Sequence, residues 1–393
     1  MLAGAATPAD NTMTSTAAPA TPAQTATTIA DTYRQTGEAK INANDFAGAV
    51  AVFNQWVEAD PKNTQAWYFR GAAKDDAGDY AGAIADLNQA LQLDPAHAKT
   101  YYWRGRAKDA AGDHAGAMAD FSRSLELDPK NADTWLLRGE AKDDAKDYVG
   151  AVDDLNHAVE LDPKNAAAWA ARGTAKDDAG DYAGSIADLN QSLELDPTNA
   201  KAYYWRGWTK GDAGDNAGAI ADFDQSLKLD PTNAGACLEA GRAKLKGGDN
   251  AGALADFNRA VELEPQNAKA WYGRGMAKAT RDFAGAIADL NRSLQLDEKN
   301  AEAWYYRGTV KGLTNDYTGA IADFNQSLKL DPANAEAYSA RGMAKFGAHD
   351  YAGAQADLIQ ALDMHLDLNE ADNARKALAL IKMATQKKPV ATN

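Results

Sequence analysis

The sequence is poor in the residues that build covalent or metal-based sites. It has a single cysteine, Cys237, and only five histidines among 393 residues. One cysteine cannot form a disulfide within the chain, and the stretch "DDAGD" lacks both the spacing and the closing glutamate of an EF-hand loop. The histidines show no metal-ligand spacing; they are His97, His114, His157, His349 and His365. We therefore expect no metal site.

Excess positive charge and long apolar runs are missing as well. The formal net charge is -15, which predicts repulsion from nucleic acid and anionic membranes. No apolar run approaches the length of a membrane span. The sequence also offers no nucleophile beside a base, no phosphate-binding glycine loop and no distinctive pair of carboxylates. We expect neither catalysis nor a cofactor.

The first 25 residues differ in composition from the rest. They are rich in Ala, Thr, Ser and Pro and begin without a basic segment, so they are not a complete secretory signal. Such a composition predicts a flexible leader or stalk. Because it resembles the segment that follows a cleaved signal, it favours a periplasmic or secreted bacterial protein, and the cytoplasm is the alternative.

A repeat of 34 residues fills most of the chain. Asp-Pro recurs at this spacing from Asp60 to Asp230, and Glu264-Pro265 and Asp331-Pro332 continue the series. One copy has 33 residues, because a residue is missing from the turn near Ala277. Counting in both directions predicts ten tandem copies between residues 26 and 364.

Each copy carries two amphipathic helical patterns with a Gly-Asp break between them. In the second copy this break is Gly78-Asp79, and aspartate occupies the second position in all ten copies, as expected for an N-cap. Gly71 also recurs in all ten copies, opposite small residues such as Ala83. Small facing side chains allow two helices to cross closely, so each copy predicts a helical hairpin. The recurrence of Gly82 has no such explanation from the sequence.

The array resembles tetratricopeptide (TPR) repeats. The residues that carry the resemblance lie at the spacing of that family, from about residue 26 to residue 364, and are Trp67, Gly71, Ala83, Leu87, Ala90 and Pro95. The resemblance implies an all-α protein, a right-handed α-solenoid of tandem antiparallel helix pairs. Residues 365–388 are amphipathic and are expected to form a capping helix, with a short tail at 389–393.

Three charged positions depart from the family pattern or repeat with unusual regularity. They are the positions of Arg70, Lys74 and Asp86, and Lys74 is lysine in all ten copies. Arg70 and Lys74 share one helical face, so a ladder of ion pairs to the partner helix is the expected structural role, with Arg138 and Arg172 as further members. A basic stripe for anionic ligands is the functional alternative.

Functional residues of a solenoid are expected at positions that vary between copies. By resemblance, the first helices line the concave groove. Groove tyrosines would be Tyr68, Tyr102, Tyr204, Tyr272 and Tyr305. Acidic groove residues would be Asp75, Asp109, Asp143 and Asp177. Apolar ones would be Leu245, Met276, Leu313 and Phe346. Tyrosines packed between repeats and solvated turn aspartates are the alternative interpretations.

The sequence thus favours a non-catalytic scaffold that binds an extended protein segment. The expected partner is basic where it meets the aspartates of repeats two to six, and apolar where it meets repeats seven to ten. A self-assembling structural subunit of an extracellular filament or matrix is the first alternative. A glycan stacked on the rings is the second.

Overall fold

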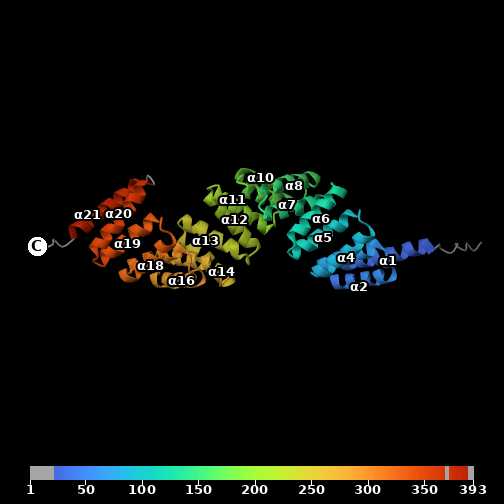
Figure 1. The fold of residues 1–393 in the computed structure, drawn as a ribbon, viewed down its shortest axis with the longest axis horizontal. Coiled ribbons are helices and arrows are strands. Elements are labelled where there is room, and N and C mark those ends of the chain that lie inside the picture. The colour runs from blue at the N-terminus through green and yellow to red at the C-terminus, as the bar shows by residue number, and fades with distance from the viewer. Residues whose placement is uncertain (1–21, 368–370, 388–393) are drawn as a thin grey trace, which may run out of the picture. The chain divides into compact units, whose positions relative to one another are not determined.

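The computed structural model describes the backbone of residues 22–367 and 371–387 (Figure 1). The predicted leader falls largely outside these residues, and the predicted tail at 389–393 falls outside them entirely. The chain divides into two compact units, residues 1–163 and residues 164–393, each of which is described by itself.

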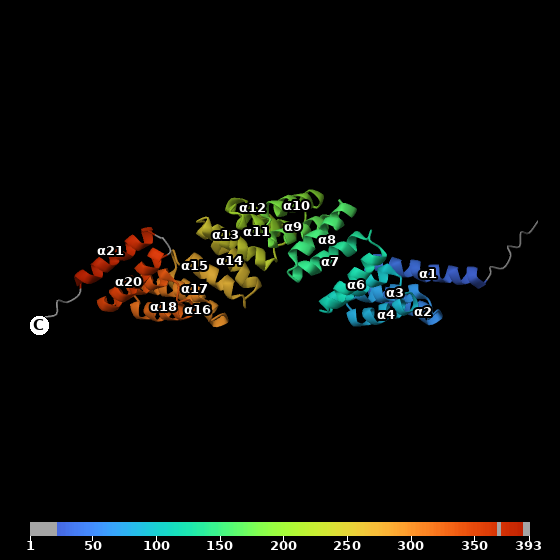
Figure 2. The ribbon, with the colours of Figure 1, turned by 45° about the horizontal axis from the view of Figure 1, so that its top comes forward.

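The first unit is a stack of antiparallel helix pairs, in which each helix packs on the next (Figures 1 and 2). Its helices are α1 (Pro22–Asn42), α2 (Phe46–Ala59), α3 (Thr64–Asp76), α4 (Tyr80–Leu93), α5 (Ala98–Ala110), α6 (His114–Leu127), α7 (Ala132–Asp144) and α8 (Tyr148–Leu161).

The second unit continues the same pattern, and the described residues of the whole chain contain no strand. Its helices are α9 (Ala166–Asp178), α10 (Tyr182–Leu195), α11 (Ala200–Asp212), α12 (Asn216–Leu229), α13 (Ala234–Lys246), α14 (Asn250–Leu263), α15 (Ala268–Lys278), α16 (Phe283–Leu296), α17 (Ala301–Leu313), α18 (Tyr317–Leu330), α19 (Ala335–Gly347), α20 (Tyr351–Asp367) and α21 (Ala371–Lys387).

The predicted break between the two helices of a copy is confirmed. Helix α3 ends at Asp76, Gly78 has a positive φ of 80°, and α4 begins after the N-cap Asp79. The Asp79 carboxylate accepts a hydrogen bond from the Gly82 amide at 3.0 Å. This bond satisfies one of the amides that every helix leaves free in its first turn.

The same contact explains the recurring glycine that the sequence left unexplained. A methyl group at Gly82 would overlap the carboxylate of Asp79, and the equivalent overlap occurs at all ten copies. The aspartate cap therefore requires glycine three residues later, because the carboxylate occupies the space that a side chain would need.

The core of each copy lies between its two helices. Gly71 faces the side chain of Leu87 and the carbonyl oxygen of Ala83, and Ala83 and Leu87 are completely buried. Cys237, expected to be a small buried apolar residue, is also completely buried, and burial raises the pKa of its thiol to about 11. The inner helical stripes predicted from spacing thus form the core.

The predicted capping segment contains helix α21, which packs on α20. Ala377 and Ala384 are buried, whereas Leu378 and Met383 are exposed. The exposed surface of α21 is therefore only partly polar.

Candidate functional site

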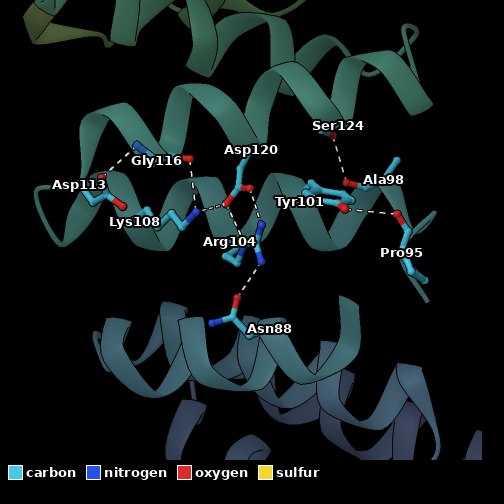
Figure 3. Close-up of polar contacts among 10 residues, drawn as sticks. All are labelled: Asn88, Pro95, Ala98, Tyr101, Arg104, Lys108, Asp113, Gly116, Asp120 and Ser124. Atoms are coloured by element: carbon cyan, nitrogen blue, oxygen red, sulfur yellow. Dashed lines mark hydrogen bonds and ion pairs between the residues drawn. The ribbon is translucent and has the colours of Figure 1, made fainter. Parts of the chain in front are cut away.

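The charged positions form a ladder of ion pairs inside the repeats, as Figure 3 shows for the third repeat. Arg104 on α5 donates two hydrogen bonds to Asp120 on α6, at 2.8 and 2.6 Å, and Lys108 Nζ lies 2.8 Å from the same carboxylate. Arg104 also donates to the side-chain oxygen of Asn88 on α4, at 2.7 Å. One guanidinium therefore ties three helices together across the boundary between two repeats.

An aromatic side chain completes each unit of the ladder. The Arg70 guanidinium carbon lies 4.6 Å from the centre of the Trp67 ring, and the indole N–H of Trp67 donates to the Pro61 carbonyl at 2.9 Å. The planar guanidinium of arginine can stack on a ring while its fork of N–H groups makes a bidentate carboxylate contact, and the ammonium group of lysine cannot reproduce that bidentate geometry.

The ladder extends through both units. Its arginine–aspartate pairs are Arg70–Asp86, Arg104–Asp120, Arg138–Asp154, Arg172–Asp188, Arg206–Asp222, Arg274–Asp289, Arg307–Asp323 and Arg341–Asp357. These aspartates are only 3 to 6% exposed. Because each carboxylate is buried against two cations, the geometry favours the structural role over a basic stripe for ligands.

Repeat seven departs from the ladder in several positions at once. Ala240 replaces the arginine and Cys237 replaces the aromatic residue on which it would stack. Lys244 compensates, because its ammonium lies 2.8 Å from Asp256 and 2.7 Å from Asp224, and Asp224 occupies the position that is Asn88 in repeat two. A single lysine therefore bridges two carboxylates where other repeats use arginine and lysine.

The predicted groove tyrosines are partly buried and contact neighbouring rings. Tyr68 packs edge-on against His97, Tyr204 lies 5.9 Å from Phe223, and Tyr305 lies 5.8 Å from Phe324 between ring centres. Burial raises the pKa of Tyr204 to about 12. The pKa of Tyr102 is also raised by burial. Packing accounts for much of the surface of these rings.

The acidic wall of repeat two is already neutralised, which corrects the expectation that Asp75 is free to attract a ligand. Arg106 on α5 donates to Asp75 at 2.7 Å and to Asp76 at 2.6 Å. The Asp75 side chain is only 2% exposed, and burial raises the pKa of its carboxyl despite the guanidinium.

The other predicted acids differ in their surroundings. Asp109 lies 2.8 Å from the exposed His114, and this contact raises the pKa of the imidazole. Burial is the main cause of the raised pKa of Asp177. Asp143 is half-buried.

The second unit contains an open cleft of about 700 Å³ along the first helices of repeats six to nine. Three predicted residues line it, namely Tyr272, Leu245 and Met276. Leu313 is 61% exposed and does not line it, and Phe346 lines a separate small cavity. Further lining residues that the sequence analysis did not single out include Trp208, Asp212, Glu239, Arg242, Lys246, Lys269, Glu302 and Tyr306.

Glycines in place of larger residues shape the cleft. Gly211 stands where repeat two has Asp75, and Gly273 stands where other copies have Phe69, Trp205 or Tyr306. A side chain at Gly273 would overlap the ring of Phe257, whereas one at Gly211 would meet only the methyl group of Ala219, at 3.9 Å. Glycine at these two positions was visible in the sequence, but alanine or glycine also occurs there in other copies, as at Ala171 and Gly312, so the sequence alone did not mark them.

Charged groups of both signs line the cleft. Arg242 lies 3.2 Å from Glu239, and burial raises the pKa of that glutamate. The Tyr272 hydroxyl donates to Glu302 at 3.1 Å, and burial together with this carboxylate raises the pKa of the phenol. Two of the three acids are therefore engaged within the protein.

Comparison with known families agrees with this architecture. Models described as TPR repeat or tetratricopeptide repeat match several consecutive stretches of the chain, which are residues 34–98, 73–132, 110–174, 178–211, 200–233, 241–280 and 313–347. These stretches lie within the array of helices described above. The chain belongs to the tetratricopeptide repeat family.

Solved structures of other TPR proteins resemble parts of this TPR protein. A tetratricopeptide repeat protein from Parabacteroides merdae is 17% identical over 64% of this chain and 99% of its own, with a TM-score of 0.50. MamA is 26% identical over 44% of this chain and 94% of its own, with a TM-score of 0.39. YrrB, titled a TPR protein with an unusual peptide-binding site, is 18% identical over 48% and 97%, with a TM-score of 0.42. No curated protein matches the chain.

Two kinds of site are absent from the described part of this TPR protein. No group of three or more His, Cys, Asp or Glu side chains among the described residues could hold a metal ion. No helix in residues 22–367 or 371–387 is both long and apolar enough to cross a membrane. The cleft in repeats six to nine is the candidate site.

Proposed function

We propose that this TPR protein is a non-catalytic interaction scaffold that binds an extended segment of a protein partner in the cleft of repeats six to nine. The observation that carries the proposal is the cleft itself, about 700 Å³ and lined by rings, aliphatic side chains and charges. This volume is in the range of specific binding pockets, in which apolar walls supply contact area and polar groups fix the orientation of the ligand.

The walls favour an extended segment over a compact ligand. They come from the successive helices α11, α13, α15 and α17, so equivalent positions recur along the cleft. A chain laid across them would contact Trp208, Met276 and Tyr306 in turn. Aromatic and methionine side chains supply large contact areas and adapt to different partners.

The composition of the cleft supports binding without catalysis. Its described lining contains no serine, cysteine, threonine or histidine, the side chains that most often serve as a nucleophile or with it as its base. Of its three carboxylates, Glu239 contacts Arg242 and Glu302 accepts a hydrogen bond from Tyr272.

The finer features of the partner stay predictions. Basic residues of a partner are still expected at Asp109 and Asp143 in the first unit and at Asp177 in the second, but the pairing of Asp75 with Arg106 removes repeat two from this expectation. Self-assembly, glycan binding and a periplasmic or secreted location are the remaining proposals from the sequence.

Selection from a library of capped random peptides, followed by affinity measurement, tests the proposal. Met276→Ala removes a side chain from the cleft, and Met343→Ala is the matched control because it changes the same position of repeat ten, outside the cleft. We expect Met276→Ala to weaken the selected peptides about tenfold and Met343→Ala to leave their affinity unchanged. A library that yields no binder, or binders equally affected by both variants, would contradict the proposal.

A further inference from the structure

Two arginines occupy the same position of their repeats but have different partners. They are Arg106 in repeat three and Arg242 in repeat seven, each two residues after the ladder position. The other copies place Glu38, Ala72, Glu140, Thr174, Trp208, Met276, Thr309 or Met343 there, so these arginines are not part of the regular ladder.

Arg106 is paired with acidic residues of the preceding repeat. It makes charge-assisted hydrogen bonds to Asp75 and Asp76 at 2.7 and 2.6 Å, and its side chain is 36% exposed. Its charge is therefore balanced within the protein by two carboxylates at the end of α3.

Arg242 lacks this arrangement because the preceding repeat has Gly211 where repeat two has Asp75. Among the described residues its only ion pair is with Glu239, at 3.2 Å, and its side chain is 60% exposed. Asp212, the equivalent of Asp76, lines the same cleft but makes no ion pair with Arg242 in the described structure. The guanidinium consequently keeps donors available toward the cleft.

Two further cations lie beside Arg242. Lys246 is four residues later on α13 and therefore on the same helical face, and Lys269 lies in the first turn of α15. Both are exposed and line the cleft. Two apolar residues of the cleft lie close to these cations in the fold. Leu245 is on α13, the helix of Arg242, and Trp208 is on α11, the first helix of the preceding repeat.

We propose that Arg242, with Lys246 and Lys269, binds the side-chain carboxylates of an acidic partner segment whose large apolar residue occupies the cleft. This rests on the proposed function and names the chemistry of its ligand. Three acids line the same cleft. Glu239 contacts one nitrogen of Arg242, Glu302 accepts from the Tyr272 hydroxyl, and Asp212 makes no ion pair among the described residues. The remaining nitrogens of Arg242 and the ammonium groups of Lys246 and Lys269 have no ion pair in the described structure and can meet the ligand. Guanidinium groups suit carboxylates because they donate two parallel hydrogen bonds.

Three capped, fluorescently labelled peptides test the ligand chemistry by anisotropy. All contain a central Phe-Leu pair, flanked by Asp and Glu, by Lys and Arg, or by Ser and Gly, and their amidated ends remove the terminal carboxylate. We expect the acidic peptide to bind at least about tenfold tighter than the basic one, and to weaken as salt rises. Equal affinities for the three peptides would overturn the inference.

A single substitution tests the structural reason for the availability of Arg242. Gly211→Asp places an aspartate directly before Asp212 and so recreates the Asp75-Asp76 pair of repeat two. The site has room for a side chain. Gly312→Asp is the matched control, because Gly312 has the same surroundings, with Ala320 at 3.9 Å, but is followed in the next repeat by Met343. We expect Gly211→Asp to weaken the acidic peptide about tenfold or more, and Gly312→Asp to have no effect.

A second variant keeps the inference testable if Gly211→Asp alters the fold, which thermal melting would show. Arg242→Gln removes the charge from an exposed side chain, and Arg242→Lys retains it. The acidic peptide should lose affinity with glutamine and recover part of it with lysine. If cleft-dependent binders from the random library show neither acidic residues nor sensitivity to Arg242→Gln, the inference fails while the proposed function stands. If no peptide binds, both fail.

Discussion

Repeats three and seven use the same arginine position in opposite ways. Arg106 reaches back 31 residues to Asp75 and becomes part of the internal structure, whereas Arg242 finds Gly211 at the equivalent place and faces an open cleft. The residue that decides the role of an arginine thus lies in the neighbouring repeat. A solenoid can create a site by deleting an internal partner as well as by adding a ligand-binding residue.

The same two repeats also differ in the ladder. Repeat three holds Asp120 with both Arg104 and Lys108, while repeat seven holds Asp256 with Lys244 alone and gives that lysine a second carboxylate, Asp224. The cleft therefore lies against the one repeat among two to ten whose internal ion pairs are simplified.

The largest effect is expected from breaking a complete ladder unit. Arg138→Met would leave the buried Asp154 with Lys142 alone, and we expect a loss of about 3 kcal/mol in the free energy of unfolding. Arg242→Met, the same change at the cleft, should cost less than about 0.5 kcal/mol because its side chain is largely exposed. Chemical denaturation measures both, and similar losses would erase the distinction between ladder and cleft arginines.

A somewhat smaller effect should follow from removing Lys244. Lys244→Met would leave Asp256 and Asp224 without their shared cation, and we expect a loss of about 2 kcal/mol at pH 7. Lys210→Met is the control and should cost less, because Arg206 still holds Asp222.

This loss has a defined pH dependence. Burial raises the pKa of the Asp256 carboxyl in the folded protein above its value in the unfolded chain. The stability that this group contributes is therefore fully present below the unfolded pKa and is lost as pH rises through the folded pKa. Removing Lys244 raises that pKa further, and the deficit of Lys244→Met should therefore shrink on acidification from pH 7 to about pH 4.5. A deficit that is constant between these pH values would argue against an uncompensated carboxylate.

Glycine substitutions sharpen the contrast between a structural glycine and the cleft glycine. Gly116→Ala would displace the Asp113 cap and should cost about 1 kcal/mol, although alanine normally favours a helix. Gly211→Ala has open space and should stabilise α11 by up to about 1 kcal/mol. Melting temperatures of the two variants should move in opposite directions; a shift of the same sign would show that the cap contact is unimportant.

The smallest effect concerns two histidines of repeat three. His97 lies against Tyr68 and Thr100, and burial lowers the pKa of its imidazole, so protonation disfavours the folded state as pH falls through that pKa. The hydrogen bond to Asp109 raises the pKa of His114. Titration by NMR should give His97 the lower of the two pKa values, and the reverse order would contradict the described contacts.

Local patterns were sufficient to predict the helices and part of the site. The Asp79 cap, the Gly71 crossing and the burial of Cys237 follow from short-range spacing, and each agrees with the structure. The cleft residues Tyr272, Leu245 and Met276 were found because they vary between copies. Arg242 was missed because its significance depends on the identity of Gly211, which lies 31 residues earlier and has no local relation to it.

The repeat itself, its helix boundaries and the composition of each position follow from the sequence, because caps, helix breaks and apolar spacing act over a few residues. The stacking of helices added the information that Asp75 is buried beneath Arg106, that Asp79 lies over Gly82, and that Arg242 borders an open cleft. The contact between Asp75 and Arg106 joins the first helices of two successive repeats, and the cleft is lined by the first helices of four successive repeats. Whether a charge is balanced internally or left for a partner depends on distances between side chains, and packing brings together residues that the chain separates by almost a full repeat.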